Sequence, residues 1–458
     1  MILCSPTPIE FLNKELLVNE PNRRTVGRAA LAAGLGPSAI GSSVLADDLA
    51  DQTIRSFLKP YVMDRPSVEA FLDPKARVWA KFDPDTGYLL RNSFMRDGVD
   101  GSHTLARYEP SGQRYQVNYR DQPCRINTYG NSFTQGHQSN DGETWQEILA
   151  AHYGEPIRNW GIGGFGVYQA SLRLEKVEKS DLNAEYVIFN IWGDDHWRSI
   201  NAWRQITFPP EVVKGLSGKM FHSNPWRHAR LDPNTGAIID RPNLADTPEK
   251  LRSMCEEQTV FDWFRNDMIV HALIAIRTGQ IVNRASIDEM VAVTGLKNLA
   301  FSTPDQVRGS TQKVYEAYAI KAGMRIMERV QESLAKLNKK LFVLLSYPGS
   351  NVWHACAGKP QTTVPIFDFH PREFVEFLQA RKIPFVDSVA SHVTEFSQFK
   401  IDAKAYVDRY YIGHYNPRGQ HFFAFAIKDE LNRWLSPKPP TYRDQTETPI
   451  GFKGYLPG

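Results

Sequence analysis

The sequence predicts an α/β fold, a three-layer α/β/α sandwich around a mainly parallel five-stranded sheet. Two observations predict it: short, nearly continuous apolar runs alternate with segments of helical periodicity, and the first runs end in turn residues. Strands of a parallel sheet are buried on both faces and read as apolar throughout, and alternation with helices is typical of repeated βα units. The apolar runs cover residues 124–129, 157–160, 186–192, 341–345 and 384–386.

Helical periodicity fills the gaps between these runs. In residues 142–153, Trp145, Ile148 and Leu149 share one face of a helix. The same criterion predicts helices over residues 167–177, 311–337, 372–381 and 420–435. Together with the apolar runs they make one large α/β domain over residues 123–458.

Two regions interrupt the βα rhythm. Residues 47–122 are rich in turns, with short strand-like runs such as residues 77–82, and predict a small β-rich leader region. Residues 197–310 contain Pro209-Pro210 and one expected helix over residues 262–277, and predict an insertion at the mouth of the sheet.

Composition limits the partners. The 458 residues carry 54 Lys and Arg against 51 Asp and Glu, a net charge of +3 without a dense basic run. This balance gives no reason to expect a nucleic-acid partner. Beyond the N-terminal region no stretch approaches the ~20 apolar residues of a membrane span. The oligomeric state is not determined by the sequence.

The N-terminal residues resemble a twin-arginine export signal. Arg23-Arg24 precede the uncharged, Ala/Gly-rich residues 29–46, which end in Val44-Leu45-Ala46. We therefore expect residues 1–46 to be removed and the mature protein to be periplasmic or secreted. The alternative, an amphipathic first helix, would be interrupted by several glycines and a proline.

The cysteines indicate no metal site. Loss of residues 1–46 would remove Cys4 and leave Cys124, Cys255 and Cys356, whose spacing matches no zinc pattern. One disulfide together with one thiol is a possible arrangement of the three. Asp194-Asp195-His196 are consecutive, and consecutive residues rarely converge on one ion, so we expect no metal.

Four segments at the ends of the predicted strands or before the last helix carry the chemistry: residues 129–136 (YGNSFTQG), 159–166 (NWGIGGFG), 193–196 (GDDH) and 414–419 (HYNPRG). Carboxyl ends of parallel strands are where such sheets bind ligands. In this order, the segments resemble the sequence blocks of the SGNH/GDSL serine hydrolases. The resemblance covers roughly residues 124–192 and 341–435.

The resemblance implies a serine esterase without a cofactor. It makes Ser132 the nucleophile and His414 the base that removes its proton, with the Ser132 and Gly164 N–H groups as oxyanion donors. The implied reaction hydrolyses a carboxyl ester through an acyl-enzyme. With the expected export and the aromatic content, a small-molecule or glycan ester, above all an O-acylated or O-acetylated carbohydrate, is the expected substrate.

The sequence departs from the family pattern at three positions. Asn131 stands where the family has Asp, and Asp194 stands where it has an Asn that donates to the oxyanion. Our hypothesis is that Asn131 supplies the missing amide donor, or that Asp194 has another role such as orienting a group. Tyr411 occupies the place of the acid three residues before the histidine, so a backbone carbonyl or another acid would orient His414. The candidate acids are Asp194, Asp195, Asp387 and Asp408.

Three alternatives remain open. Gly161, Gly163 and Gly166 also satisfy the GxGxxG pattern of a dinucleotide-binding oxidoreductase. A non-catalytic glycan-binding protein could keep the fold without the activity. A glycan O-acyltransferase would use the same Ser132 and His414 and differ only in the acceptor.

Overall fold

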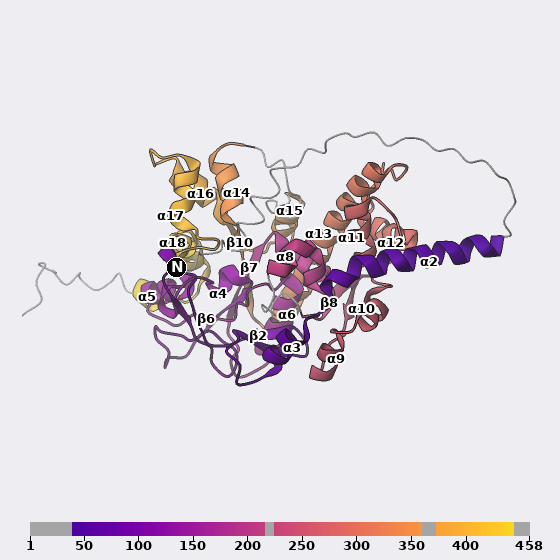
Figure 1. The fold of residues 1–458 in the computed structure, drawn as a ribbon. Helices are drawn as coiled ribbons and strands as arrows, with labels where there is room; N and C mark the ends of the chain where they lie inside the picture. The colour runs from indigo at the N-terminus through magenta and orange to yellow at the C-terminus, as the bar shows by residue number, and fades with distance from the viewer. Residues whose placement is uncertain (1–38, 216–223, 360–371, 444–458) are drawn as a thin grey trace, which may run out of the picture. The chain divides into compact units, whose positions relative to one another are not determined.

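The computed structural model describes residues 39–215, 224–359 and 372–443. The chain divides into two compact units, one formed by residues 1–88 with 200–321 and the other by residues 89–199 with 322–458. The expected leader, residues 47–122, is therefore divided between the units. The expected insertion, residues 197–310, falls almost entirely in the first unit. Figure 1 labels many of the helices and some of the strands of the two units.

The second unit contains a five-stranded sheet whose described pairings are all parallel. The strand order is β11-β10-β7-β5-β6. The predicted α/β class and the five predicted strands are confirmed, with small shifts at the ends. The strands are β5 (Ile126–Gly130), β6 (Arg158–Asn159), β7 (Tyr186–Trp192), β10 (Lys340–Ser346) and β11 (Phe385–Asp387).

Burial explains why these runs are strands. Every residue of β5 and β7 is buried, and in β10 only Lys340 is exposed. Strands covered on both faces exclude water from both sets of side chains, which favours continuous apolar sequence. The central strands pair in register from Ile126 beside Tyr186 to Gly130 beside Asn190.

Helices connect the parallel strands in an arrangement compatible with a three-layer α/β sandwich. Two of them, over residues 167–177 and 372–380, match the predictions to within one residue. The last helix begins at Pro417, earlier than predicted, because the Asn416 side chain caps it by accepting from Gly419 N at 3.0 Å. The helices are α4 (Ser132–Gln135), α5 (Trp145–Tyr153), α6 (Val167–Val177), α7 (Asp194–Ile200), α14 (Gly349–Cys356), α15 (Arg372–Ala380), α16 (Ser388–Phe396), α17 (Ala403–Tyr410) and α18 (Pro417–Trp434).

The second unit also carries a short hairpin ahead of the sheet. Its strands are β3 (Ser93–Met95) and β4 (Thr104–Ala106), which pair antiparallel. The long helix α13 (Pro304–Lys336) was predicted from residue 311 and starts earlier; its residues belong to both units.

The first unit is mixed rather than β-rich in its N-terminal part. Asp64 caps one helix there by accepting from Ser67 N at 3.0 Å, with Pro66 in the first turn, a start signal that the turn-rich composition obscured. The elements up to residue 90 are α2 (Ala39–Leu58), η1 (Lys59–Tyr61), α3 (Arg65–Leu72), β1 (Ala80–Asp83) and β2 (Gly87–Leu90). Residues 1–38 of the predicted export signal lie outside the described part of the chain. α2 runs through Gly41, which a helix tolerates at a cost of about 1 kcal/mol.

The rest of the first unit is largely helical. The helix expected over residues 262–277 is two helices, because Asp267 accepts from Ile269 N at 2.8 Å and Val270 N at 3.1 Å and so starts a new helix. The elements are η4 (Arg204–Thr207), α8 (Pro210–Gly215), β8 (His228–Leu231), β9 (Ile238–Arg241), α9 (Pro248–Ser253), α10 (Glu257–Phe264), α11 (Met268–Thr278) and α12 (Arg284–Thr294).

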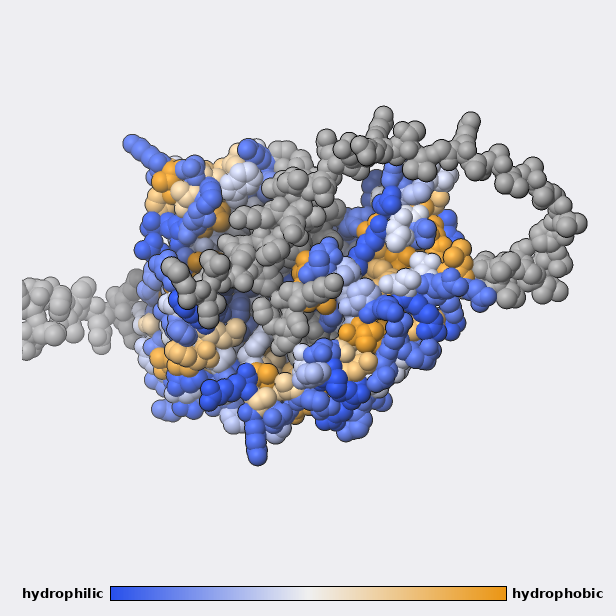
Figure 2. Space-filling view, in the orientation of Figure 1, coloured by the Kyte–Doolittle hydropathy of each residue, from blue (hydrophilic) through white to orange (hydrophobic). Residues whose placement is uncertain are grey.

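The described surface shows no membrane-spanning helix: no helix within the described ranges has both the length and the apolar character to cross a bilayer. On the face shown in Figure 2, hydrophilic residues surround separate apolar groups. Cys124, Cys255 and Cys356 are free thiols, so the disulfide considered from the sequence does not form among them.

Candidate active site

The turn between β5 and α4 presents Ser132. Gly130 has φ +147°, and a Cβ there would lie 2.4 Å from the Asn190 carbonyl oxygen, so a side chain is excluded. Asn131 caps α4 by accepting from Phe133 N at 2.8 Å. Ser132 is the first residue of α4, directly beyond the carboxyl end of β5. The local sequence therefore fixes the serine at the edge of the sheet where parallel strands end.

Ser132 and His414 meet although 282 positions separate them. His414 Nε2 lies 2.8 Å from Ser132 Oγ, a hydrogen-bonding distance. His414 lies in the turn between α17 and α18, where Ile412 N donates to the His414 carbonyl at 2.9 Å. The Phe133 ring lies 5.2 Å from the imidazole. The structure thus brings together the two residues that the sequence analysis selected.

The pair lies at the topological switch point of the sheet. β5 and β7 are neighbours in the sheet but not in the chain, and the strand order reverses direction between β5 and β7. Connections leave the two sides of such a point in opposite directions and open a crevice at the carboxyl ends of the strands, where open α/β sheets bind ligands. Ser132 follows β5 and Asp194 follows β7.

The glycine-rich loop after β6 lies against the nucleophile. Gly163 N donates to Gln135 Oε1 at 2.8 Å, and a Cβ on Gly163 would lie 3.4 Å from Ser132 Cβ. Gly164 has φ +89°. Among the contacts of the described residues, neither the Ser132 N–H nor the Gly164 N–H has an acceptor. Neither of the two predicted oxyanion donors is therefore committed to an acceptor within the described part of the chain.

The Asn131 amide, hypothesised from the sequence to be an oxyanion donor, forms hydrogen bonds within the protein. Asn131 is fully buried, and its Nδ2 donates to Asp195 Oδ2 at 2.5 Å. Its Oδ1 accepts the capping hydrogen bond from Phe133 N. Asn131 therefore caps α4 through Oδ1 and binds Asp195 through Nδ2, a different contact from the oxyanion bond hypothesised for it.

Arg198 holds both acidic residues of the third segment. Its Nε lies 2.7 Å from Asp194 Oδ2, and its Nη1 lies 3.0 Å from Asp195 Oδ1. The Arg198 charge at Asp194 offsets the repulsion that an isolated carboxylate would exert on an oxyanion. Asp195 Oδ2 also accepts from Trp192 N at 2.9 Å. Burial raises the pKa of Asp195 to about 7, against the lowering effects of Arg198, Trp192 N and Asn131.

The other acids considered from the sequence are engaged elsewhere. Asp195 binds the side chain of Asn131, the residue before Ser132. Asp408 is exposed and forms an ion pair with Lys404. Asp387 caps α16 by accepting from Val389 N at 3.1 Å, and burial raises its pKa. None of their described contacts reaches the imidazole of His414.

Gln138 and His137, which were not predicted from the sequence, contact His414. Gln138 Oε1 accepts from His414 N at 2.8 Å and lies 3.3 Å from His414 Nδ1. The His137 ring lies 4.8 Å from the His414 ring, and burial lowers the pKa of His137, with Asp97 opposing the shift. Both residues follow directly on the YGNSFTQG segment, which is the signal that could have found them; the family pattern assigns them no role.

Close packing accounts for the glycines of the GxGxxG pattern. A Cβ on Gly161 would lie 2.3 Å from Gln135 N, and one on Gly166 would lie 2.7 Å from Ser199 N. At the start of α6, Gly166 N donates to Gln169 at 3.2 Å and Tyr168 N to Ser199 at 3.1 Å. These N–H groups, which a dinucleotide phosphate would need, already have acceptors within the protein.

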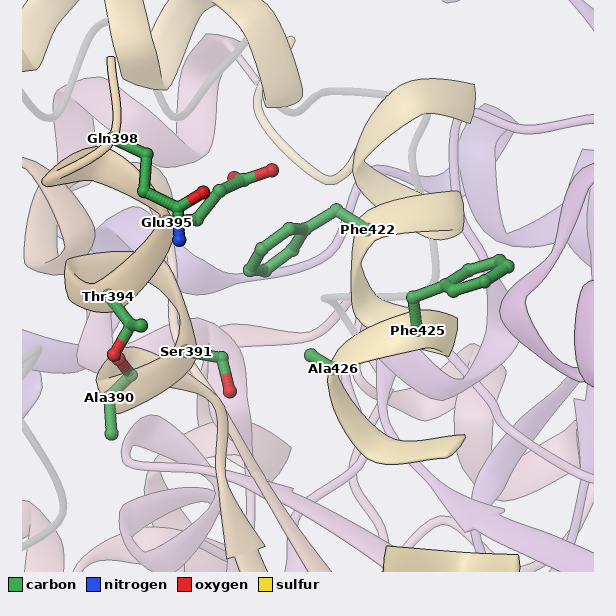
Figure 3. A pocket seen from close by; sticks show the side chains of 8 residues that line it. All are labelled: Ala390, Ser391, Thr394, Glu395, Gln398, Phe422, Phe425 and Ala426. Carbon is green, nitrogen blue, oxygen red and sulfur yellow. The ribbon is translucent and has the colours of Figure 1, made fainter. Parts of the chain in front are cut away.

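A separate groove lies between α16 and α18 (Figure 3). Its volume is about 440 Å³. Phe422 points from α18 towards α16, whereas Phe425 points away from it. Glu395 accepts from Tyr406 at 2.7 Å and from Tyr410 at 2.8 Å, so its carboxylate is already engaged. The residues that line the groove do not include Ser132 or His414.

Comparison with known proteins adds little to this geometry. No protein-family model and no curated protein matches the chain. Six solved chains match; one of them is 13% identical, with a TM-score of 0.31, over 68% of this chain and 96% of its own. A similarity of this size carries no argument about fold or function, so any functional conclusion depends on the site itself.

Proposed function

We propose that the chain is a serine esterase of the SGNH/GDSL type that acts through an acyl-enzyme on Ser132. One observation carries the proposal: His414 Nε2 lies 2.8 Å from Ser132 Oγ at the switch point of a parallel sheet. A serine hydroxyl becomes a useful nucleophile when an imidazole in hydrogen-bonding contact removes its proton. The N–H groups of Ser132 and Gly164, which have no acceptor among the described residues, would supply the oxyanion donors.

The reaction follows from this arrangement. His414 Nε2 takes the Ser132 proton as Oγ attacks the ester carbonyl carbon, and the carbonyl electron pair moves onto oxygen, facing the Ser132 and Gly164 N–H groups. When this intermediate collapses, the bond to the alcohol oxygen breaks and His414 returns the proton to that oxygen. Water then attacks the acyl-enzyme, with His414 again as base, and releases the acid and free Ser132.

The proposed substrate is an O-acylated carbohydrate, and the proposed location is the periplasm or the cell exterior. Support comes from the resemblance of the N-terminal residues to a twin-arginine export signal and from the aromatic content, 10 Trp, 18 Tyr and 25 Phe, whose rings can stack on sugars. The mechanism written above requires no cofactor.

Labelling with a fluorophosphonate tests the proposal. The probe phosphonylates only an activated serine, so we expect wild-type protein to react and Ser132→Ala to lose the reaction. Ser139→Ala is the matched control. Ser139 is a buried serine in the loop after α4, and its Oγ has no hydrogen-bond partner in the described part of the chain. Labelling of Ser132→Ala at the wild-type rate, or no labelling of folded wild-type protein, would overturn the proposal. If labelling depends on Ser132, the release of acid from acetylated glycans would define the substrate.

A further inference from the structure

The contact between Gln138 and His414 has a consequence for the proposed reaction. We infer that Gln138 is a positioning residue whose neutral amide holds His414 with its proton on Nδ1. The inference depends on the proposed esterase function for its catalytic meaning, but the protonation of His414 can be measured without catalysis.

The amide of Gln138 has a fixed direction. Its Nε2 donates to the Asp97 carbonyl oxygen at 2.9 Å, and a carbonyl can only accept. Oε1 must then face His414, where it accepts from the backbone N at 2.8 Å and lies 3.3 Å from Nδ1. Because Nδ1 faces an acceptor, it carries the proton in the neutral ring. Nε2 is left with its lone pair towards Ser132 Oγ, the tautomer that a general base requires.

The backbone is arranged to bring this amide to the histidine. Gln138 has φ +68°, a left-handed conformation that costs a non-glycine residue about 1 kcal/mol or more and that clusters at functional sites. Gly413 has φ +111°, and a Cβ there would lie 3.1 Å from Gln138 Oε1. Arg114 braces the same loop by donating to the carbonyls of Gly136 at 2.9 Å and Ser139 at 2.6 Å. A packing glutamine needs none of these features.

The charges around His414 define what a neutral partner changes. His137, beside the imidazole, has its pKa lowered by burial. Asp97 Oδ2 lies 3.9 Å from His137 Nε2, and the Arg114 charge acts against protonation of His137. A carboxylate at position 138 would stabilise the imidazolium and hold it protonated to higher pH, whereas the amide does not. A glutamine at position 138 therefore leaves the His414 imidazole unprotonated, and able to act as a base, down to a lower pH than a glutamate would.

Two substitutions in the full-length protein separate positioning from simple packing. Gln138→Glu supplies a carboxylate oxygen at the same place, and Gln138→Met keeps the volume but removes the acceptor. The readout is the rate of fluorophosphonate labelling of Ser132 from pH 5 to pH 9. We expect Q138E to keep the plateau rate and to shift the acidic limb upward by about 1 pH unit or more. We expect Q138M to lose at least about tenfold of the plateau. Gln113→Met, at another buried glutamine of the same unit, should leave the profile unchanged.

The tautomer itself is measured by ¹⁵N NMR of the imidazole. We expect wild-type His414 to carry its proton on Nδ1 and Q138M to lose that preference. A proton on Nε2 in wild-type protein, or a Q138M profile equal to wild type, overturns the inference. Absence of Ser132-dependent labelling in wild-type protein overturns the esterase proposal instead, and the NMR result then still decides the role of Gln138.

Discussion

Replacing Arg198 tests the buried charge network behind the nucleophile. Arg198 is 3% exposed, contacts Asp194 and Asp195, and lies 4.6 Å from the Trp192 ring. Arg198→Met keeps an apolar stem of similar reach and removes the charge. Asp195, 2% exposed, then keeps only neutral donors among its described contacts. Breaking a buried pair from one side costs about 3–5 kcal/mol because the remaining charge is left without its partner.

The titration of Asp195 determines how the difference in free energy of unfolding between wild type and R198M changes with pH. Burial raises the pKa of Asp195 to about 7 in the wild-type fold, although Arg198 opposes the shift. Without Arg198 that pKa rises further. Below pH 7 the carboxyl holds its proton in both folded proteins, so its ionisation adds nothing to their difference in stability. Above pH 7 the folded wild type loses the Asp195 proton, because Arg198 stabilises the carboxylate, whereas the folded variant keeps the proton. The difference between their free energies of unfolding therefore grows by about 1.4 kcal/mol per pH unit. From pH 6 to pH 9 the variant should therefore lose about 3 kcal/mol more than the wild type.

Urea unfolding of the wild type and R198M at pH 6, 7, 8 and 9 measures this difference. The double variant R198M with Asp195→Asn should lose the pH-dependent part, because the titrating group is gone. Arg372→Met is the matched control: Arg372 pairs with Glu376 at 2.6 Å on α15 but is 91% exposed, so its removal should change stability little. A difference between R198M and wild type that is equal at pH 6 and pH 9 would refute the reasoning.

Two further substitutions address the nucleophile turn. Gly161→Ala should abolish labelling of Ser132 and lower the unfolding temperature, since its Cβ would lie 2.3 Å from Gln135 N; Gly142→Ala, with nothing nearer than 3.9 Å, should change neither. Asn131→Asp should destabilise the fold at pH 8 by about 1–3 kcal/mol, because two carboxylates would meet at a 2.5 Å contact, and adding Asp195→Asn should restore part of the loss. Fluorophosphonate labelling measures the loss of reactivity in Gly161→Ala, and thermal unfolding followed by circular dichroism measures the stability of both variants. A stable N131D at pH 8 would contradict the assigned contact with Asp195.

The sheet could be predicted from the sequence because its strands are buried on both faces. A short, continuous apolar run such as residues 186–192 is typical of a strand covered by helices on both sides, and the structure places β7 at those residues. The N-terminal part was predicted less well. Its helix over residues 65–72 is short and starts from a capping aspartate within a turn-rich region, where local composition outweighed the cap signal.

The site could be predicted only where a motif assigns a chemical role to a residue. Ser132 and His414 were predicted from the resemblance of their segments to the SGNH/GDSL blocks, and the structure brings them into contact. The partner of His414 could not be predicted, because Gln138 reaches it through a left-handed backbone and a flanking Gly413, and neither leaves a periodic pattern in the sequence. Long-range geometry of this kind becomes visible only when the turn conformations are known.

The amides at the site are consistent with the proposed catalysis, although three residues depart from the SGNH/GDSL pattern that the sequence resembles. The chemistry needs an acceptor for His414 Nδ1 and a cap for the helix that begins at Ser132, and it does not require either group to be an acid. Gln138 Oε1 provides the first and Asn131 Oδ1 the second. The negative charge is moved behind the turn to Asp195, where Arg198 compensates it. Each change is coherent only with the others, because an acid at position 131 would face Asp195 directly. These residues therefore form one consistent arrangement around the serine, as the proposed esterase activity requires.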